Sequence, residues 1–191
     1  MIKRSIVGLA ALLVASRGHA QAMFDYVSYQ GRDTVEDAIP VTSGDYRNPI
    51  IPGFHPDPSL VRVGEDYYLV NSTFGWFPGL PIYHSRDLVT WQQIGNAINR
   101  PGMVDIESVG INRGLFAPTI RWHMGLFYII NTCIDCGSNF IITARDPKGP
   151  WSDPVWLKEI DGIDPDIFFD GDGRVWITYN GPPESAPDYE G

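Results

Sequence analysis

Three stretches of the chain repeat one order of apolar and polar positions. They cover residues 58–70, 118–130 and 165–177, and each begins with a proline and a short apolar run. A turn containing Gly or Asp follows, and the stretch then continues through aromatic and β-branched residues. Two apolar runs around such a turn are typical of a β-hairpin. We therefore predict one hairpin in each stretch.

A second motif recurs between the hairpins. Ser-Arg-Asp-Leu-Val-Thr-Trp at residues 85–91 is echoed by Ala-Arg-Asp-Pro-Lys-Gly-Pro-Trp at residues 144–151. The arginines of the two copies are 59 residues apart, and the first two hairpins start 60 residues apart. A repeat of roughly 50–60 residues with about four strands is typical of a β-propeller blade. An ordinary β-sandwich is the alternative, and the matched spacing of two motifs favours the propeller.

The number of repeats predicts that the chain is part of a longer protein. Two blades and the beginning of a third fit into residues 48–191, whereas the smallest closed rings use about four blades. We expect a truncated, N-terminal part of an all-β propeller. We also expect this piece alone to fold poorly, because an open ring exposes strand edges.

Composition narrows the class of protein further. Of 191 residues, 43% are apolar, 13% are aromatic and only 19% are charged, with 20 glycines and 16 prolines. Such a mixture suits short strands joined by turns and argues against helix bundles and coiled coils. The net charge of −9 disfavours nucleic acid and anionic membranes as partners.

The first 22 residues have the organisation of a secretory signal peptide. Lys3 and Arg4 precede an apolar stretch over residues 6–15, and Ala-Gln-Ala at residues 20–22 provides a cleavage site. This stretch is shorter than the roughly 20 residues of a membrane-spanning helix, so we expect no membrane association after cleavage and a periplasmic or extracellular location. Residues 23–47 are polar and are expected to form an N-terminal extension.

The chain has two cysteines, Cys133 and Cys136, in a single Cys-x-x-Cys motif. After export they could form a tight disulfide or remain a pair of buried thiols, and the sequence leaves both open. Structural zinc is disfavoured because such a site needs four ligands and the chain has no second cysteine pair.

Acidic residues precede the proline in two of the three hairpin repeats. The residue is Asp57 in the first copy, Ala117 in the second and Asp164 in the third. Equivalent positions on the inner strands of a propeller face the axis at one end, so we expect the two carboxylates to converge on one pocket, with Ala117 leaving space between them. A proline on each side of Asp57 predicts an extended backbone there. The alternative is that each Asp-Pro pair only caps a turn.

Aromatic residues lie near both acids. Phe74, Trp76 and Phe77 fall in a loop or strand end, and Phe116 directly precedes Ala117. The apolar faces of sugar rings stack on aromatic side chains, so these residues and Ala117 are candidates for lining a carbohydrate-binding pocket. Packing inside the blades is the alternative role for the aromatic residues.

Five segments resemble glycoside hydrolase family 43, and most closely its β-xylosidase and α-L-arabinofuranosidase branch. They are Asn-Pro-Ile-Ile-Pro-Gly-Phe-His-Pro-Asp-Pro-Ser-Leu at residues 48–60, Ser-Thr-Phe-Gly-Trp-Phe-Pro-Gly at 72–79, Tyr-His-Ser-Arg-Asp-Leu at 83–88, Gly-Leu-Phe-Ala-Pro at 114–118 and Gly-Ile-Asp-Pro-Asp-Ile-Phe-Phe at 162–169. The resemblance implies a five-bladed β-propeller that hydrolyses xylo- or arabino-oligosaccharides with inversion. This chain would supply about the first two to three blades.

The resemblance also implies roles for the two acids. Asp57 matches the general base that activates water, and Asp164 matches the carboxylate that orients the general acid and raises its pKa. The general acid of the family is a glutamate in a Glu-Gly-Pro-His-like segment, which we expect beyond residue 191. We therefore expect this piece alone to be inactive.

Other functions and ligands remain as alternatives. A noncatalytic carbohydrate-binding propeller or an inactive truncated homologue would bind sugar without hydrolysis, and a related propeller enzyme for sialic acid or fructans is a weaker option. We expect an oligosaccharide partner and assign no cofactor and no metal ligand. A structural Ca²⁺ in the propeller channel would be consistent with the family, but Asp-Gly-Asp-Gly at residues 170–173 is better explained as a hairpin turn.

Overall fold

The computed structural model describes residue 40 and residues 42–181. The predicted signal peptide and most of the predicted extension lie outside the described residues. The described elements are all β-strands, which confirms the predicted all-β class. Over the same residues, no helix has the length and apolarity needed to cross a membrane.

The first sheet contains four antiparallel strands that are neighbours in the order of the sequence. They are β1 (Ser59–Val63), β2 (Asp66–Val70), β3 (Gly79–Ser85) and β4 (Gln92–Ile98). Strands β1 and β2 form the first predicted hairpin, in which Val63 pairs with Asp66 across a two-residue turn. Gly64 occupies this turn with a φ of +64°, a conformation that glycine adopts without steric cost.

The second sheet has five strands, and the third has two. Strands β5 (Gly114–Leu115), β6 (Thr119–His123), β7 (Leu126–Ile134), β8 (Ser138–Ala144) and β9 (Val155–Trp156) form the second, in which β5 and β6 both pair with β7. Strands β10 (Ile163–Phe169) and β11 (Val175–Asn180) form the third. The hairpins β6–β7 and β10–β11 are the other two that the repeats predicted.

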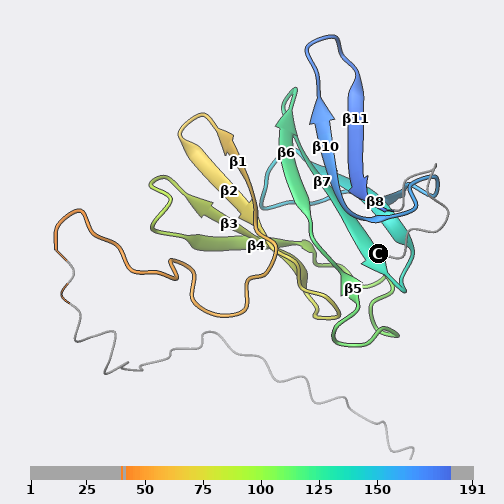
Figure 1. Ribbon diagram of the computed structural model, residues 1–191, viewed down its shortest axis with the longest axis horizontal. Coiled ribbons are helices and arrows are strands. Elements are labelled where there is room, and N and C mark those ends of the chain that lie inside the picture. The colour runs from red at the N-terminus through yellow and green to blue at the C-terminus, as the bar shows by residue number, and fades with distance from the viewer. Residues whose placement is uncertain (1–39, 41, 182–191) are drawn as a thin grey trace, which may run out of the picture. The chain divides into compact units, whose positions relative to one another are not determined.

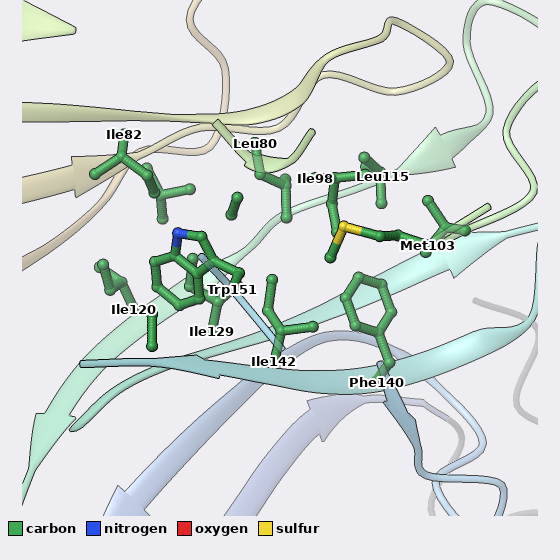
Figure 2. Close-up of a cluster of buried hydrophobic side chains, with 14 of the residues drawn as sticks. Leu80, Ile82, Ile98, Met103, Leu115, Ile120, Ile129, Phe140, Ile142 and Trp151 are labelled. Atoms are coloured by element: carbon green, nitrogen blue, oxygen red, sulfur yellow. The ribbon is translucent and has the colours of Figure 1, made fainter. Parts of the chain in front are cut away.

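The hydrophobic core lies between the first and second sheets (Figure 2). The first sheet contributes Leu80, Ile82 and Ile98, which are fully buried. Phe140 from the second sheet is fully buried as well, and Trp151, the last residue of the second Arg-Asp motif, is 2% exposed. Trp151 therefore packs between two neighbouring sheets.

The three sheets lie side by side, and their predicted hairpins contact one another (Figure 1). Strand β1 contacts β6, and β10 contacts β6 and β7. Arg121 of β6 forms an ion pair with Asp166 of β10 at 2.6 Å, and His123 of β6 stacks on Phe169 of β10. This succession agrees with propeller blades around an axis. Within residues 42–181, however, the sheets number three and do not close a ring.

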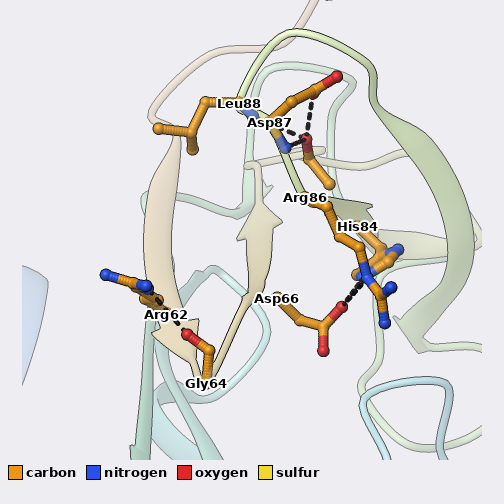
Figure 3. A network of polar contacts seen from close by, with 8 residues as sticks. Arg62, Gly64, Asp66, His84, Arg86, Asp87 and Leu88 are labelled. Carbon is orange, nitrogen blue, oxygen red and sulfur yellow. Dashed lines mark hydrogen bonds and ion pairs between the residues drawn. The ribbon is translucent and has the colours of Figure 1, made fainter.

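The Ser-Arg-Asp motif of the first sheet forms a hydrogen-bonded turn at the end of β3 (Figure 3). The hydroxyl of Ser85 donates to the carboxylate of Asp87 at 3.0 Å. Asp66, at the start of β2, lies 2.7 Å from Nε2 of His84 and accepts a hydrogen bond from Arg86 at 2.9 Å. These contacts join β2 to β3 at the end of the sheet opposite Asp57.

The structure decides two questions that the sequence left open, the state of the two cysteines and the role of residues 170–173. Cys133 and Cys136 form a disulfide at the turn between β7 and β8. Residues 170–173 form the turn between β10 and β11, and the carboxylate of Asp170 accepts hydrogen bonds from two backbone N–H groups and from the indole of Trp176. The Asp-Gly-Asp-Gly segment is therefore a hairpin turn, as its sequence favoured.

Candidate active site

Asp57 and Asp164 share an uncommon backbone conformation. Asp57 lies before β1 with a φ of +53°, and Asp164 is the second residue of β10 with a φ of +54°. The left-handed region costs most residues roughly 1–2 kcal/mol, and aspartate is among the few that tolerate it. Ala117, the matching residue before β6, does not adopt a positive φ. The two acids are thus distinguished from the alanine by geometry as well as by chemistry.

The extended backbone predicted for Asp57 is wrong. The prediction used the steric preference of a residue before proline, which is a local effect. In the structure, the carbonyl oxygen of Pro56 accepts hydrogen bonds from the side-chain amide of Asn71 and from the backbone N–H of Ser72, each at 3.2 Å. The peptide before Asp57 is thus held by hydrogen bonds from residues that directly follow β2, contacts that a local preference does not include.

Asp57 is exposed, but one of its two carboxylate oxygens is hydrogen-bonded to a buried residue. The hydroxyl of Ser72 donates a hydrogen bond to Oδ2 of Asp57. Ser72 is 2% exposed. The donor residue is therefore buried, whereas the acceptor residue Asp57 is exposed to solvent. The sequence pattern offered no signal for this contact, because the two residues are 15 positions apart.

Asp164 is electrostatically coupled to Asp57. Its side chain reaches solvent, yet partial burial raises the pKa of the Asp164 carboxyl, and the negative charge of Asp57 raises this pKa further. A like charge acts in this way only when it is near. The fold therefore brings together two acids that are 107 positions apart in the sequence.

The segment before Asp164 is fixed from the second sheet. The amide of Asn139, which is fully buried, donates hydrogen bonds to the carbonyl oxygens of Ile160 at 3.0 Å and Gly162 at 2.8 Å. Its Oδ1 accepts a hydrogen bond from Thr132 at 2.6 Å. Sequence reasoning missed Asn139, because nothing in the motif around Asp164 points to β8.

Three phenylalanine rings form a continuous row. Phe74 lies between Phe54 and Phe116, with ring centroids 6.0 Å and 5.3 Å away. The backbone of Phe74 exchanges two hydrogen bonds with Leu115, which places the loop after β2 against β5. Phe74 and Phe116 were predicted from the sequence. Phe54 was missed, although it belongs to the same Gly-Phe-His-Pro-Asp-Pro run as Asp57.

The remaining predicted residues differ in their surroundings. Trp76 is 63% exposed and Phe77 is 49% exposed, so neither serves as blade core. Ala117 is half-buried, and the N–H of the preceding Phe116 donates to the carbonyl oxygen of Thr132 at 3.0 Å.

A cavity of about 900 Å³ in the described part of the chain includes two of the predicted residues, Phe74 and Trp76. Its wall continues over Pro81 and Tyr83 of β3. Side chains alternate along a strand and Ile82 belongs to the core, so this wall is the face of the first sheet turned away from the second. Ser72 also lines the cavity, whereas Asp57 and Asp164 do not. The candidate acids and the main cavity are therefore neighbours and not one pocket.

A second, smaller cavity of about 430 Å³ lies next to the segment that carries Asp164. The disulfide loop between β7 and β8 forms one wall, and residues 161–163 form another. Arg113 and Asp135 in its lining are joined by an ion pair at 2.7 Å, which lowers the pKa of the Asp135 carboxyl. In the residues described by the structure, no group of three or more His, Cys, Asp or Glu side chains is arranged to hold a metal ion.

Comparison with known proteins identifies the family. A family model described as Glycosyl hydrolases family 43 matches residues 46–190. The chain is 49% identical over 146 residues to a xylosidase/arabinosidase of Butyrivibrio fibrisolvens, an alignment that covers 75% of this chain and 28% of that protein. It is 52% identical over 150 residues to the non-reducing end alpha-L-arabinofuranosidase BoGH43B of Bacteroides ovatus, covering 76% of this chain and 27% of that protein.

Solved structures agree with this assignment. A crystal structure of a GH43_12 protein retrieved from capybara gut metagenome matches with a TM-score of 0.76 and 43% identity, over 83% of this chain and 30% of that one. The xyloglucan GH43B of Bacteroides ovatus matches with a TM-score of 0.66 and 48% identity, over 69% and 27% of the two chains. The chain thus spans between a quarter and a third of the length of these relatives. It belongs to glycosyl hydrolase family 43.

Proposed function

We propose that the complete protein hydrolyses glycosidic bonds of xylo- or arabino-oligosaccharides in hemicellulose degradation. Support comes from the family and from relatives that are named xylosidases or arabinofuranosidases. The observation that carries the proposal is the pair of acids, because Asp57 and Asp164 share one backbone conformation and the charge of one acts on the other. Such coupled carboxylates are typical of glycosidase sites.

In the proposed mechanism the base is Asp57 and the reaction inverts the anomeric carbon. Asp57 takes a proton from a water molecule while the water oxygen attacks that carbon and the glycosidic bond breaks. A glutamate outside this chain, roughly 6.5–9.5 Å from the base, protonates the leaving oxygen. The negative charge of Asp164 raises the pKa of that glutamate and keeps it protonated, because nearby like charges disfavour ionisation.

The predicted aromatic residues, together with Phe54, are proposed to bind the sugar. Phe54, Phe74 and Phe116 form a row of rings, and Trp76 is an exposed aromatic side chain in the loop that contains Phe74. Apolar sugar faces stack on such rings. Ala117 has no side chain beyond Cβ to fill the space between the two acids.

We further propose that residues 48–191 supply the first two to three blades of a five-bladed ring. Two apolar surfaces support this. Phe168 and Trp176, which are 60% and 52% exposed, are cross-strand neighbours on the third sheet, and the wall of the 900 Å³ cavity lies on the outer face of the first sheet. Further blades would cover both. Residues 1–22 are proposed to direct export to the periplasm or the extracellular space.

The test is hydrolysis of aryl β-xyloside and aryl α-L-arabinofuranoside by the complete protein. Asp57→Asn keeps the shape of the side chain and removes the base, so we expect kcat to fall by about 10²–10⁴-fold, the usual contribution of general base catalysis. Asp172→Asn makes the same chemical change on the exposed turn between β10 and β11 and is expected to retain activity. Product analysis by NMR is expected to give the inverted anomer first.

Two results would contradict the proposal. Near-normal turnover by Asp57→Asn would reject the assignment of the base. Carbohydrate binding without any hydrolysis by the wild-type complete protein would favour a noncatalytic propeller instead.

A further inference from the structure

Three possible hydrogen-bond donors surround the carbonyl oxygen that precedes Asp57. The acceptor is the oxygen of Pro56, and the donors are Nδ2 of Asn71 at 3.2 Å, the N–H of Ser72 at 3.2 Å and the hydroxyl of Ser72 at 3.4 Å. Asn71 is 1% exposed and Ser72 is 2% exposed. The base therefore follows a peptide group that the buried end of β2 holds in place.

The asparagine part of this arrangement is repeated in the second sheet. Asn131 stands 14 residues after Ala117, as Asn71 stands 14 residues after Asp57. Nδ2 of Asn131 donates to the carbonyl oxygen of Phe116 at 2.6 Å, so it binds the peptide before Ala117 in the same way. Because this contact also exists where no acid is present, the asparagine is a shared feature of the first two sheets and is not specific to the acid.

The hydroxyl that follows each asparagine behaves differently in the two copies. In the second sheet it belongs to Thr132 and donates to Oδ1 of Asn139. In the first sheet it belongs to Ser72 and donates to Oδ2 of Asp57. The contact between hydroxyl and carboxylate thus occurs in the copy that carries the candidate base, and in that copy it cannot be ascribed to the common framework of the repeat.

Ser72 has one hydroxyl proton and two acceptors within reach. The carboxylate of Asp57 lies nearer than the carbonyl oxygen of Pro56, and hydrogen bonds to charged acceptors are stronger. The carbonyl oxygen already has two other donors. The proton of Ser72 is therefore assigned to Asp57, which is otherwise exposed.

We propose that Ser72 is the positioning residue of the general base Asp57, a proposal that rests on the function proposed above. Its buried hydroxyl fixes Oδ2, so that the other carboxylate oxygen is aimed at the attacking water. The reaction rate depends steeply on the position of the catalytic oxygen, since a misplacement of about 1 Å can cost about 100-fold in rate. Ser72 would thus act on kcat through Asp57 and not through substrate affinity.

The decisive comparison is between Ser72→Thr and Ser72→Val in the complete protein. The two variants have nearly the same shape and differ in the hydroxyl, and Ser72 lines the 900 Å³ cavity. We expect the threonine variant to keep kcat within about threefold of wild type. We expect the valine variant to lose about 10–100-fold in kcat, with KM changed by less than about twofold, because ground-state binding is not touched.

A matched control separates catalysis from folding. Ser85 is also 2% exposed and also donates to an aspartate, but it pairs with Tyr67 near the start of β2, whereas Ser72 follows the end of that strand. Ser72→Ala and Ser85→Ala are expected to lower stability similarly, as measured by urea unfolding, while only Ser72→Ala lowers kcat. This pair also decides the question if the valine variant fails to fold.

The outcomes distinguish this inference from the proposed function. If Asp57→Asn abolishes turnover while Ser72→Val and Ser72→Ala keep wild-type kcat, the positioning role is overturned and the base assignment stands. If Asp57→Asn retains turnover, the proposed function fails first. A fall in kcat for Ser72→Val that Ser72→Thr does not share supports the inference.

Discussion

The row of aromatic rings depends on a close approach between two backbones, and a single methyl group should disturb it. Gly114 has a φ of +93°, and a Cβ atom placed there would lie 2.7 Å from the carbonyl oxygen of Phe74. That contact is shorter than real Cβ atoms show, and the obstacle is backbone that cannot rotate away. Gly114→Ala should therefore push Phe74 and Leu115 apart and weaken the bridge that sets the position of the Phe74 ring.

The size of the effect follows from two contributions. A positive φ costs an alanine roughly 1–2 kcal/mol. Forcing an extra methyl group against packed atoms typically costs about 1–3 kcal/mol more. Gly125, in the turn between β6 and β7, provides the matched control, because its φ is +81° and a Cβ atom added there would meet nothing within 4 Å. We expect Gly125→Ala to cost about 1–2 kcal/mol and Gly114→Ala about 2–5 kcal/mol.

The assay is urea unfolding of the complete protein, with the free energy of unfolding compared between the two variants. The change in entropy of the unfolded chain is the same Gly-to-Ala change in both and cancels in the comparison. Equal losses for Gly114→Ala and Gly125→Ala would refute the reasoning, because the close approach to Phe74 would then carry no energetic weight.

Three further predictions concern the acids and the open ring. Asp57→Asn removes a nearby negative charge, so we expect the pKa of Asp164 to fall while the larger effect of burial remains, as followed by carboxyl NMR titration. Because the pKa of Asp164 is raised on folding, the folded state binds its proton more tightly, and this group lowers stability as pH rises above the unfolded pKa of about 3.9. Urea unfolding should accordingly show that Asp164→Asn gains stability relative to wild type between about pH 3 and pH 7, and an unchanged difference would contradict the cited shift. Residues 42–181 expressed alone should aggregate or bind a hydrophobic dye through Phe168 and Trp176, whereas a sharp, reversible, monomeric melting transition would oppose this.

The hairpins were predictable because their signals are local. A proline, a short apolar run, a Gly or Asp turn and a second run contain the strand period and the reversal within 13 residues. The same is true of the turn at residues 170–173, where Asp170 binds N–H groups of its immediate neighbours. Such features depend on contacts between residues close in sequence, which a pattern can reveal.

The backbone of Asp57 was mispredicted for the opposite reason. Two prolines favour an extended conformation locally, but Asp57 has a positive φ, and the peptide before it is hydrogen-bonded to Asn71 and Ser72, which are distant in the sequence. The state of Cys133 and Cys136 was equally undecidable from the motif, since a thiol pair and a disulfide have the same sequence. The structure shows that the two cysteines form a disulfide at the turn between β7 and β8.

The amino-acid sequence alone was sufficient to predict the all-β class, the three hairpins and the two acids at equivalent places in the repeat, because periodicity and turn chemistry act over short stretches. Only the tertiary structure decided which buried groups hold those acids and where the large cavity lies. Ser72 and Phe54 lie in recognisable segments and Asn139 does not, but for all three the role arises from contacts with residues distant in the sequence. A hydrogen bond or a charge interaction depends on separation in space. Only the packing of the sheets brings Asp57 near enough for its charge to raise the pKa of Asp164.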